Sequence, residues 1–185
     1  MKNNWITAEK ILIKGGVGIL PTDTLYGLVG SAFSKKAINR IYKIKERDKS
    51  KPLIVLIHSD KDLDLFGVKL ESQLSKFLGK VWPGKVSVIL PCLLKKFESI
   101  HRGTNSIAFR MIGKENKNLF NLIKKVGPIV APSANKESLS PALTIKEARD
   151  YFGSKVDFYV DGGIRKSKSS TLITFKDNKK IVLRK

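Results

Sequence analysis

The chain has 185 residues, 42% of them hydrophobic, and a net charge of +20, which suits one domain with a real core. No run of about 18 apolar residues exists and the first residues lack the apolar stretch of a signal peptide, so neither a membrane-spanning helix nor a secretory leader is expected. Cys92 is the one cysteine, which excludes an internal disulfide and favours the reducing cytoplasm.

The charge has two interpretations. An excess of 36 Lys and Arg over 16 Asp and Glu favours binding to polyanions through counterion release and long-range attraction. Lysine, asparagine and isoleucine are also abundant throughout the chain, as in proteins from AT-rich genomes. The charge therefore predicts either a nucleic-acid surface or compositional drift, and both remain open.

The first predicted elements are a short helix over residues 7–13, which ends at Gly15-Gly16, and a strand over residues 17–20. A dinucleotide-binding loop needs glycines after a strand and before a helix, and here they precede the strand. Pro21 ends the strand, and the side chains of residues 22–24 can bind a ligand or satisfy their own backbone in a turn.

A helix is predicted next, from its cap at Ser34 to Lys45. The irregular residues 48–52 follow, so the chain is expected to straighten after the helix, and Lys45 and Arg47 then point the same way with Lys51 nearby. Two or three cations on one side suit a triphosphate. The alternative is a solvated, charged helix end.

Arg110 lies inside an apolar run that predicts a strand over residues 107–111. Before it come a predicted strand over 53–57, a helix over 70–80 that stops before Trp82-Pro83-Gly84, and a strand over 86–90. A fixed cation inside a strand must be paired or must point at an anion. Arg110 is therefore expected either in an internal salt bridge or against an anionic ligand.

Ser133 and Asn135 follow a predicted helix over residues 116–126 and a predicted strand over residues 129–131. A hydroxyl and an amide at the carboxyl end of a strand indicate a ligand site, because α/β sheets bind ligands there. An ordinary polar turn is the alternative.

The rest of the chain is predicted to be strand-rich, with a helix from its cap at Thr144 to Phe152 and then strands over 156–160, 171–175 and 180–184. Residues 166–170 are expected to form a mobile loop. This order predicts a single α/β domain over residues 1–185, built on a large mixed sheet. His58, His101 and Cys92 are scattered, so neither a zinc site nor a Ser-His-Asp arrangement is expected.

Together these segments resemble the YrdC/TsaC family of threonylcarbamoyl-AMP synthases, over roughly residues 8–184. The resemblance implies a twisted mixed α/β sheet flanked by helices, with a central cleft, in the short single-domain form. The motifs that carry it are Pro21-Thr22-Asp23-Thr24-Leu25-Tyr26-Gly27-Leu28, Lys45-x-Arg47 with Lys51-Pro52-Leu53, Trp82-Pro83-Gly84, Arg110, Ser133-Ala134-Asn135 and Ser170-Thr171.

The resemblance also implies residue roles. The family signature, to which we assign catalysis, falls on Lys45, Arg47, Ser133 and Asn135. ATP contacts are expected from Arg47, Lys51, Ser133 and Arg184, with Ser106 as a weaker candidate. Threonine contacts are expected from Thr24, Arg110 and Ser170, and no metal ligand is assigned to the protein.

The implied reaction joins L-threonine, bicarbonate and ATP into threonylcarbamoyl-AMP, with release of pyrophosphate and water. ATP is a substrate, Mg²⁺ is expected with its triphosphate, and the product is expected to reach tRNA through separate threonylcarbamoyl-transfer proteins, with no membrane partner. Three positions depart from the family pattern. Leu56 stands where some relatives have histidine, with His58 two residues on; Ile112 replaces a common proline; and no glycine occurs within residues 136–138.

Two rival functions remain. A non-catalytic module that binds double-stranded RNA, rRNA or tRNA fits the charge, although no aromatic stacking signature is present. A carbamoyl transferase that uses carbamoyl phosphate is the second rival. Related large proteins with that activity carry zinc-finger and acylphosphatase-like domains, for which 185 residues leave no room.

Overall fold

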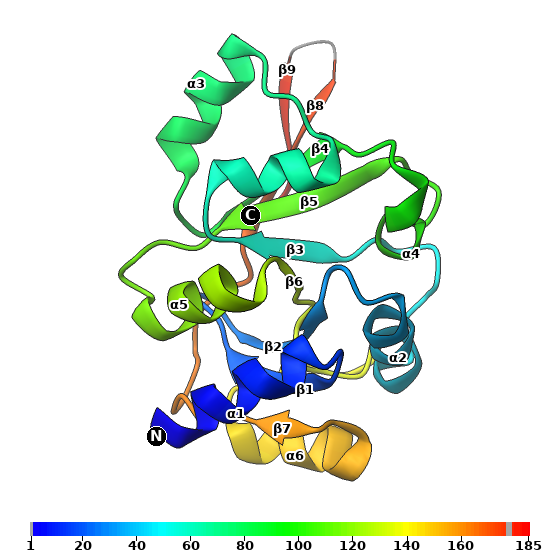
Figure 1. Ribbon diagram of the computed structural model, residues 1–185, viewed down its shortest axis with the longest axis vertical. Helices are drawn as coiled ribbons and strands as arrows, with labels where there is room; N and C mark the ends of the chain where they lie inside the picture. Colours follow the sequence, from blue (N-terminus) through cyan, green and yellow to red (C-terminus); the bar gives the residue numbers. More distant parts are fainter. Residues whose placement is uncertain (1, 177–178) are drawn as a thin grey trace.

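The strands form one mixed sheet in a computed structural model that describes residues 2–176 and 179–185. The sheet has nine strands in the order β7-β1-β2-β6-β3-β5-β4-β8-β9, which follow one another along the long axis of the molecule (Figure 1). The pairs β1–β7, β3–β5 and β4–β8 are parallel and the others antiparallel. The strands are β1 (Val17–Pro21), β2 (Tyr26–Ser31), β3 (Ile54–Ile57), β4 (Val86–Pro91), β5 (Ser106–Met111), β6 (Ile129–Val130), β7 (Phe158–Tyr159), β8 (Thr171–Lys176) and β9 (Lys179–Arg184).

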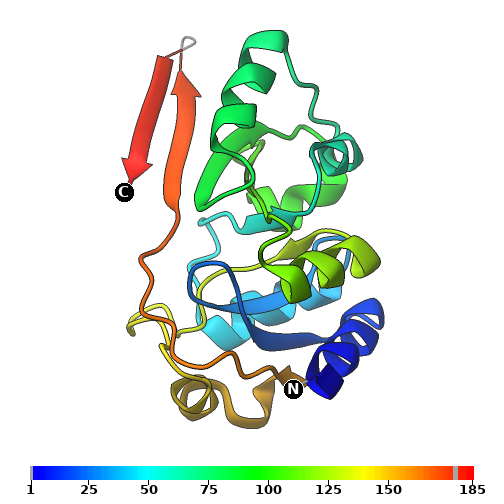
Figure 2. The same ribbon diagram turned by 90° about the vertical axis from the view of Figure 1, so that its left-hand side faces the viewer.

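Helices flank this sheet, and two of them begin at side-chain caps. The hydroxyl of Ser34 accepts a hydrogen bond from the Ala37 amide, and that of Thr144 accepts one from the Glu147 amide. In Figures 1 and 2, α3 lies toward the β8–β9 end of the molecule and α6 toward the opposite end. The helices are α1 (Lys2–Ile13), α2 (Lys35–Lys45), α3 (Ser72–Val81), α4 (Glu98–His101), α5 (Lys117–Val126) and α6 (Ile145–Phe152), with 3₁₀ turns η1 (Asp60–Phe66), η2 (Lys95–Phe97) and η3 (Gly153–Lys155).

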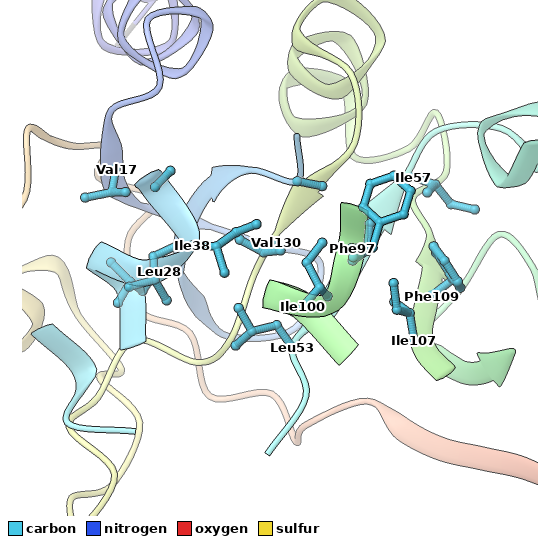
Figure 3. Packing of buried hydrophobic residues seen from close by; sticks show 14 of the residues in the cluster. Val17, Leu28, Ile38, Leu53, Ile57, Phe97, Ile100, Ile107, Phe109 and Val130 are labelled. Carbon is cyan, nitrogen blue, oxygen red and sulfur yellow. The ribbon is translucent and has the colours of Figure 1, made fainter. Parts of the chain in front are cut away.

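The two faces of the sheet bury different clusters, because successive side chains of a strand point to opposite faces. On β3, Val55 and Ile57 belong to the cluster that also contains α2, while Leu56 belongs to the cluster that contains α1 and α5. Figure 3 shows part of the first cluster, in which Leu28 and Val130 of neighbouring strands lie with Ile38 of α2. The strand β3 is therefore covered on both faces.

The expected mixed α/β sheet flanked by helices is confirmed, and every predicted helix and strand is present with small shifts at its ends. The first helix is longer than expected, since α1 begins at Lys2 rather than at residue 7. The strand β2 was missed, because two glycines interrupt its apolar pattern. A Cβ on Gly30 would come within 3.1 Å of Ala37 and Ile41 of α2, so this glycine lets the helix lie close to the sheet.

The fold joins the segments that the sequence analysis singled out. After β6, the chain pairs with β2: the Leu28 amide donates to the Pro132 carbonyl, and the Ala134 amide donates to the Tyr26 carbonyl. The β1–β2 turn over residues 22–25 is thereby set beside Ser133. None of the helices in the described ranges is long and apolar enough to cross a bilayer.

Candidate functional site

A pocket lined by hydroxyl groups and two arginines lies where these strand ends meet. Its polar lining comes from five separate segments of the chain. The residues include Thr22, Thr24, Arg110, Ser133, Ser170 and Arg184. The structure therefore brings the three expected threonine-binding residues together, and adds to them two of the residues expected to bind ATP.

Arg110 is buried in this pocket and is paired with a carboxylate of the chain. Its Nη2 lies 2.9 Å from Oδ1 of Asp23, both side chains being about 95% buried (4% and 5% exposed), and 3.5 Å from the Thr24 hydroxyl. Burial lowers the pKa of Arg110, which Asp23 opposes and Arg184 reinforces. Among the described residues, Nε of Arg110 has no hydrogen-bond partner. The internal salt bridge is thus present, while the buried Nε of the same guanidinium has no hydrogen-bond partner among the described residues.

Ser170 is fixed by two neighbours. Its hydroxyl lies 2.9 Å from that of Ser87, and Nη2 of Arg184 donates to it at 3.2 Å. Nε of Arg184 also donates to the Ser170 carbonyl at 3.1 Å, and burial lowers the pKa of Arg184. Ser87 was not expected from the sequence, in which its only signal is a hydroxyl inside the apolar run of β4. The parallel pairing of β4 with β8 explains the contact.

Lys45 is almost fully buried and holds the Ser133–Asn135 segment in place. Its ammonium donates to the carbonyls of Ser133 and Asn135, at 2.9 and 2.8 Å, and to Oδ1 of Asn135 at 3.0 Å. The same Oδ1 accepts from the Ser133 hydroxyl at 2.6 Å. Burial lowers the pKa of Lys45 to about 8, an effect that Arg47 increases and Glu137 opposes. All three N–H donors of the ammonium are used within the protein.

The turn after α2 differs from the expected extended segment. Glu46 caps the helix in the left-handed conformation, with φ of 54°. Arg47 then donates from Nε and Nη2 to the carbonyls of Lys51 and Pro52, at 3.3 and 3.0 Å. Lys45, Arg47 and Lys51 nevertheless all contact residues 133–137, since Arg47 and Lys51 both approach Glu137. The reversal at Glu46, rather than a straight strand, produces this convergence.

Ser106 lies outside the pocket lining. It begins β5, and its hydroxyl donates to the Thr104 hydroxyl at 3.3 Å. The parallel register pairs Ile54 with Ala108, so Ser106 lies near the start of β3. The chain enters β3 there from the cationic turn, which contains Arg47 and Lys51. Its assignment to ATP stays a prediction, as do the roles assigned to the other site residues.

At the histidine departure, the leucine packs in the core and the nearby histidine has partners elsewhere. Leu56 is fully buried in the cluster beneath α1 and α5, while Nδ1 of His58 lies 2.8 Å from Oδ2 of Asp62. His58 is thus engaged with η1 and with the ring of Phe120. Within the described ranges, no three His, Cys, Asp or Glu side chains gather in a way that would hold a metal ion.

Comparison with known proteins gives consistent matches. A family model described as "Telomere recombination", which covers Sua5, YciO and YrdC proteins, matches residues 10–185. The threonylcarbamoyl-AMP synthase of Pyrococcus abyssi is 32% identical over 184 residues, which are 96% of this chain and 52% of that protein. The threonylcarbamoyl-AMP synthase of Hahella chejuensis is 31% identical over 156 residues, 84% of each chain.

Solved structures match over nearly the whole chain. The crystal structure of P. abyssi Sua5 complexed with L-threonine is 26% identical, with a TM-score of 0.86, over 97% of this chain and 53% of that one. Escherichia coli YciO, at 22% identity, shares the fold with a TM-score of 0.86 over 100% of this chain and 90% of its own. The chain spans about half the length of the P. abyssi proteins that it matches.

Proposed function

This chain belongs to the family of Sua5, YciO and YrdC proteins, and from that membership we propose that it is a threonylcarbamoyl-AMP synthase. It joins L-threonine, bicarbonate and ATP and releases pyrophosphate and water. The observation that carries the proposal is the pocket around Arg110, whose Nε lacks a partner among the described residues, beside a turn with three cations. The names of two relatives and the L-threonine complex of P. abyssi Sua5 support it.

Threonine is assigned to the pocket. Its carboxylate is assigned to the guanidinium of Arg110 and faces Arg184, while the hydroxyls of Thr24 and Ser170 offer partners to its polar groups. A hydrogen bond from a charged donor contributes about 1.5–3 kcal/mol. Asp23 offsets the charge of Arg110, because a buried cation without a partner is costly.

The triphosphate is assigned to the neighbouring cationic turn. Arg47 and Lys51 supply positive charge, and the Ser133 hydroxyl connects the turn to the threonine pocket. Lys45 acts as a positioning residue, because its donors shape the Ser133–Asn135 segment. Mg²⁺ fits as an ion carried by the phosphate oxygens and water, which is its usual mode in such sites.

The chemistry requires positioning and charge stabilisation rather than a protein nucleophile. The amine of threonine and bicarbonate first form a carbamate, with loss of water. A carbamate oxygen then attacks the α-phosphorus of ATP, a new P–O bond forms, and the bond to the β-phosphate oxygen breaks with departure of pyrophosphate. The cations of the turn stabilise the charge that develops on the departing group.

The product is proposed to serve the modification of tRNA, through separate proteins that transfer the threonylcarbamoyl group. The cytoplasm is the proposed location, in keeping with a single, free cysteine, Cys92.

The test is pyrophosphate release by the pure protein incubated with ATP, L-threonine and bicarbonate. Release that requires all three compounds is expected, and Arg47→Ala is expected to abolish most of it while the protein stays folded. Release that does not depend on threonine, or full turnover of Arg47→Ala, would contradict the assignment.

Binding of RNA is a second candidate function, favoured by a groove away from the pocket. Five cations line this groove, with Glu98 as the acidic residue among its lining. The cations come from α2, the turn after it, η2 and the end of α4, and they are Lys35, Lys49, Lys95, Lys96 and Arg102. Such a groove attracts a phosphate backbone without reading its sequence.

A further inference from the structure

A carboxylate of the chain itself lies among the cations assigned to the triphosphate. Oε1 of Glu137 is paired with the Lys51 ammonium, and Oε2 lies 3.7 Å from Nη1 of Arg47. The backbone N–H of Asp48 donates to the same Oε2 at 3.2 Å. A guanidinium, an ammonium and a backbone amide are the donors that a phosphoryl group uses. Arg47, Lys51 and the Asp48 amide together form a cradle for an anion, and the carboxylate of Glu137 already occupies it.

The cradle is held in this arrangement by its own bonds. Nε and Nη2 of Arg47 are engaged by the carbonyls of Lys51 and Pro52, which leaves Nη1 toward Glu137. The Tyr42 hydroxyl also donates to the Lys51 carbonyl at 2.8 Å. Because Arg47 is tied to the turn, a phosphoryl group reaches Nη1 by displacing the carboxylate rather than by drawing the arginine away.

The carboxylate is presented by the segment that follows Asn135. The Glu137 amide donates to the Lys45 carbonyl at 3.0 Å, and the Lys136 ammonium lies 2.7 Å from Oε1 of Glu46. The Glu137 side chain is 27% exposed, so it is able to swing into water without crossing the core. The hydrogen bond from Lys51 lowers the pKa of Glu137, with a further contribution from Arg47, so the group is ionised at neutral pH.

We propose that Glu137 is an internal competitor for the triphosphate: it neutralises Arg47 and Lys51 in the free protein and is displaced when ATP binds. This inference rests on the proposed function. When only a fraction of the molecules is in the state that binds a ligand, the apparent Kd equals the Kd of that state divided by the fraction. If Glu137 fills the cradle in roughly nine molecules of ten, the apparent Kd of the triphosphate is about tenfold higher than that of the open cradle.

The test is calorimetric titration of inorganic tripolyphosphate, and separately of ATP, into the whole protein without threonine or bicarbonate. Glu137→Gln keeps the shape and an acceptor for the Asp48 amide but removes the charge. Its affinity for tripolyphosphate is expected to rise roughly fivefold to tenfold. Glu46→Gln is the matched control, because it removes the same charge from the same region and breaks only the contact with Lys136. It is expected to gain about twofold at most, from the general change in charge.

Equal gains in the two variants would overturn the inference, and so would weaker binding by Glu137→Gln. Glu137→Ala, which offers no side-chain acceptor to Asp48, is expected to match the gain of Glu137→Gln, and melting temperatures establish that each variant is folded. If neither the wild type nor any variant binds tripolyphosphate or ATP, both the inference and the ATP site fail. If Glu137→Gln binds more tightly but pyrophosphate release never requires threonine, the inference stands and the proposed reaction fails.

Discussion

At the scale of single residues, Arg110 combines a structural contact with a proposed binding role. It is paired with Asp23, and its Nε has no hydrogen-bond partner among the described residues. Arg110→Lys preserves a charge for Asp23 but loses the planar fork. We expect it to raise the KM for threonine roughly tenfold to a hundredfold, equivalent to about 1.4–2.8 kcal/mol, with a much smaller effect on the KM for ATP. Steady-state kinetics and the melting temperature distinguish a binding role from a structural one. A lower melting temperature with an unchanged KM for threonine would show that Arg110 serves only the salt bridge with Asp23.

Lys45 gives the site a pH dependence. Its pKa is lowered from 10.5 to about 8, and above that pH a neutral amine has two N–H donors for three acceptors. We expect affinity for ATP to fall as the pH rises through about 8, because the Ser133–Asn135 segment loosens. Lys45→Met is expected to bind ATP weakly at every pH, whereas Lys43→Met, which alters an exposed lysine of the same helix, is expected to keep the wild-type profile.

The effect of Lys45 on stability has the opposite sign. Its pKa in the folded protein lies below the ordinary value, so between about pH 8 and pH 10.5 the unfolded state binds more protons. This group's contribution to the free energy of unfolding therefore rises with pH across that window. Titration calorimetry of ATP and urea unfolding, each from about pH 7 to pH 9.5, measure the two trends. An ATP affinity that stays constant over this range would refute the role given to Lys45.

At the scale of elements, close packing of β1 depends on a glycine. A Cβ on Gly18 would overlap the ring of Phe158, which is buried on β7. Gly18→Ala is expected to lower the free energy of unfolding by about 1–3 kcal/mol through overpacking. Gly79→Ala is the matched control, because a Cβ at this position in the last turn of α3 meets nothing within 4 Å, and it is expected to gain about 0.5–1 kcal/mol. Urea unfolding measures both, and two changes of the same sign would contradict this account.

The sequence was sufficient for the elements that carry a clear period, such as α2 with its Ser34 cap and β3 with its continuous apolar run. It was insufficient for β2, where Gly30 is explained only by the helix α2 that packs on it. The candidate site divides in the same way. Arg110 and Ser133 were found from local pattern and resemblance, whereas the contacts of Ser87 with Ser170 and of Glu137 with Lys51 join residues 83 and 86 positions apart. No local pattern predicts such pairs.

At the scale of the whole molecule, the charge of +20 exceeds what the pocket and its turn require. Part of it lies along the groove lined by α2, η2 and the end of α4, on chain segments separate from the pocket around Arg110. Long-range attraction follows from the total charge, whereas a bound backbone needs cations fixed in one place. Nonspecific attraction should therefore depend on the total charge, whereas binding at a defined RNA surface should depend on the cations of the groove.

The groove predicts where RNA binds if the second candidate function holds. Lys95→Glu combined with Lys96→Glu is expected to weaken tRNA binding roughly tenfold more than Lys76→Glu combined with Lys80→Glu, a pair on α3 with the same change in charge. The slope of log affinity against log salt is expected to fall by about 1 to 2, because each phosphate contact contributes about 0.7–0.9. Equal losses in the two double variants would assign the binding to total charge alone, and tRNA binding that persists unchanged at high salt would exclude an electrostatic surface. Fluorescence anisotropy with labelled tRNA, at several salt concentrations, distinguishes these results.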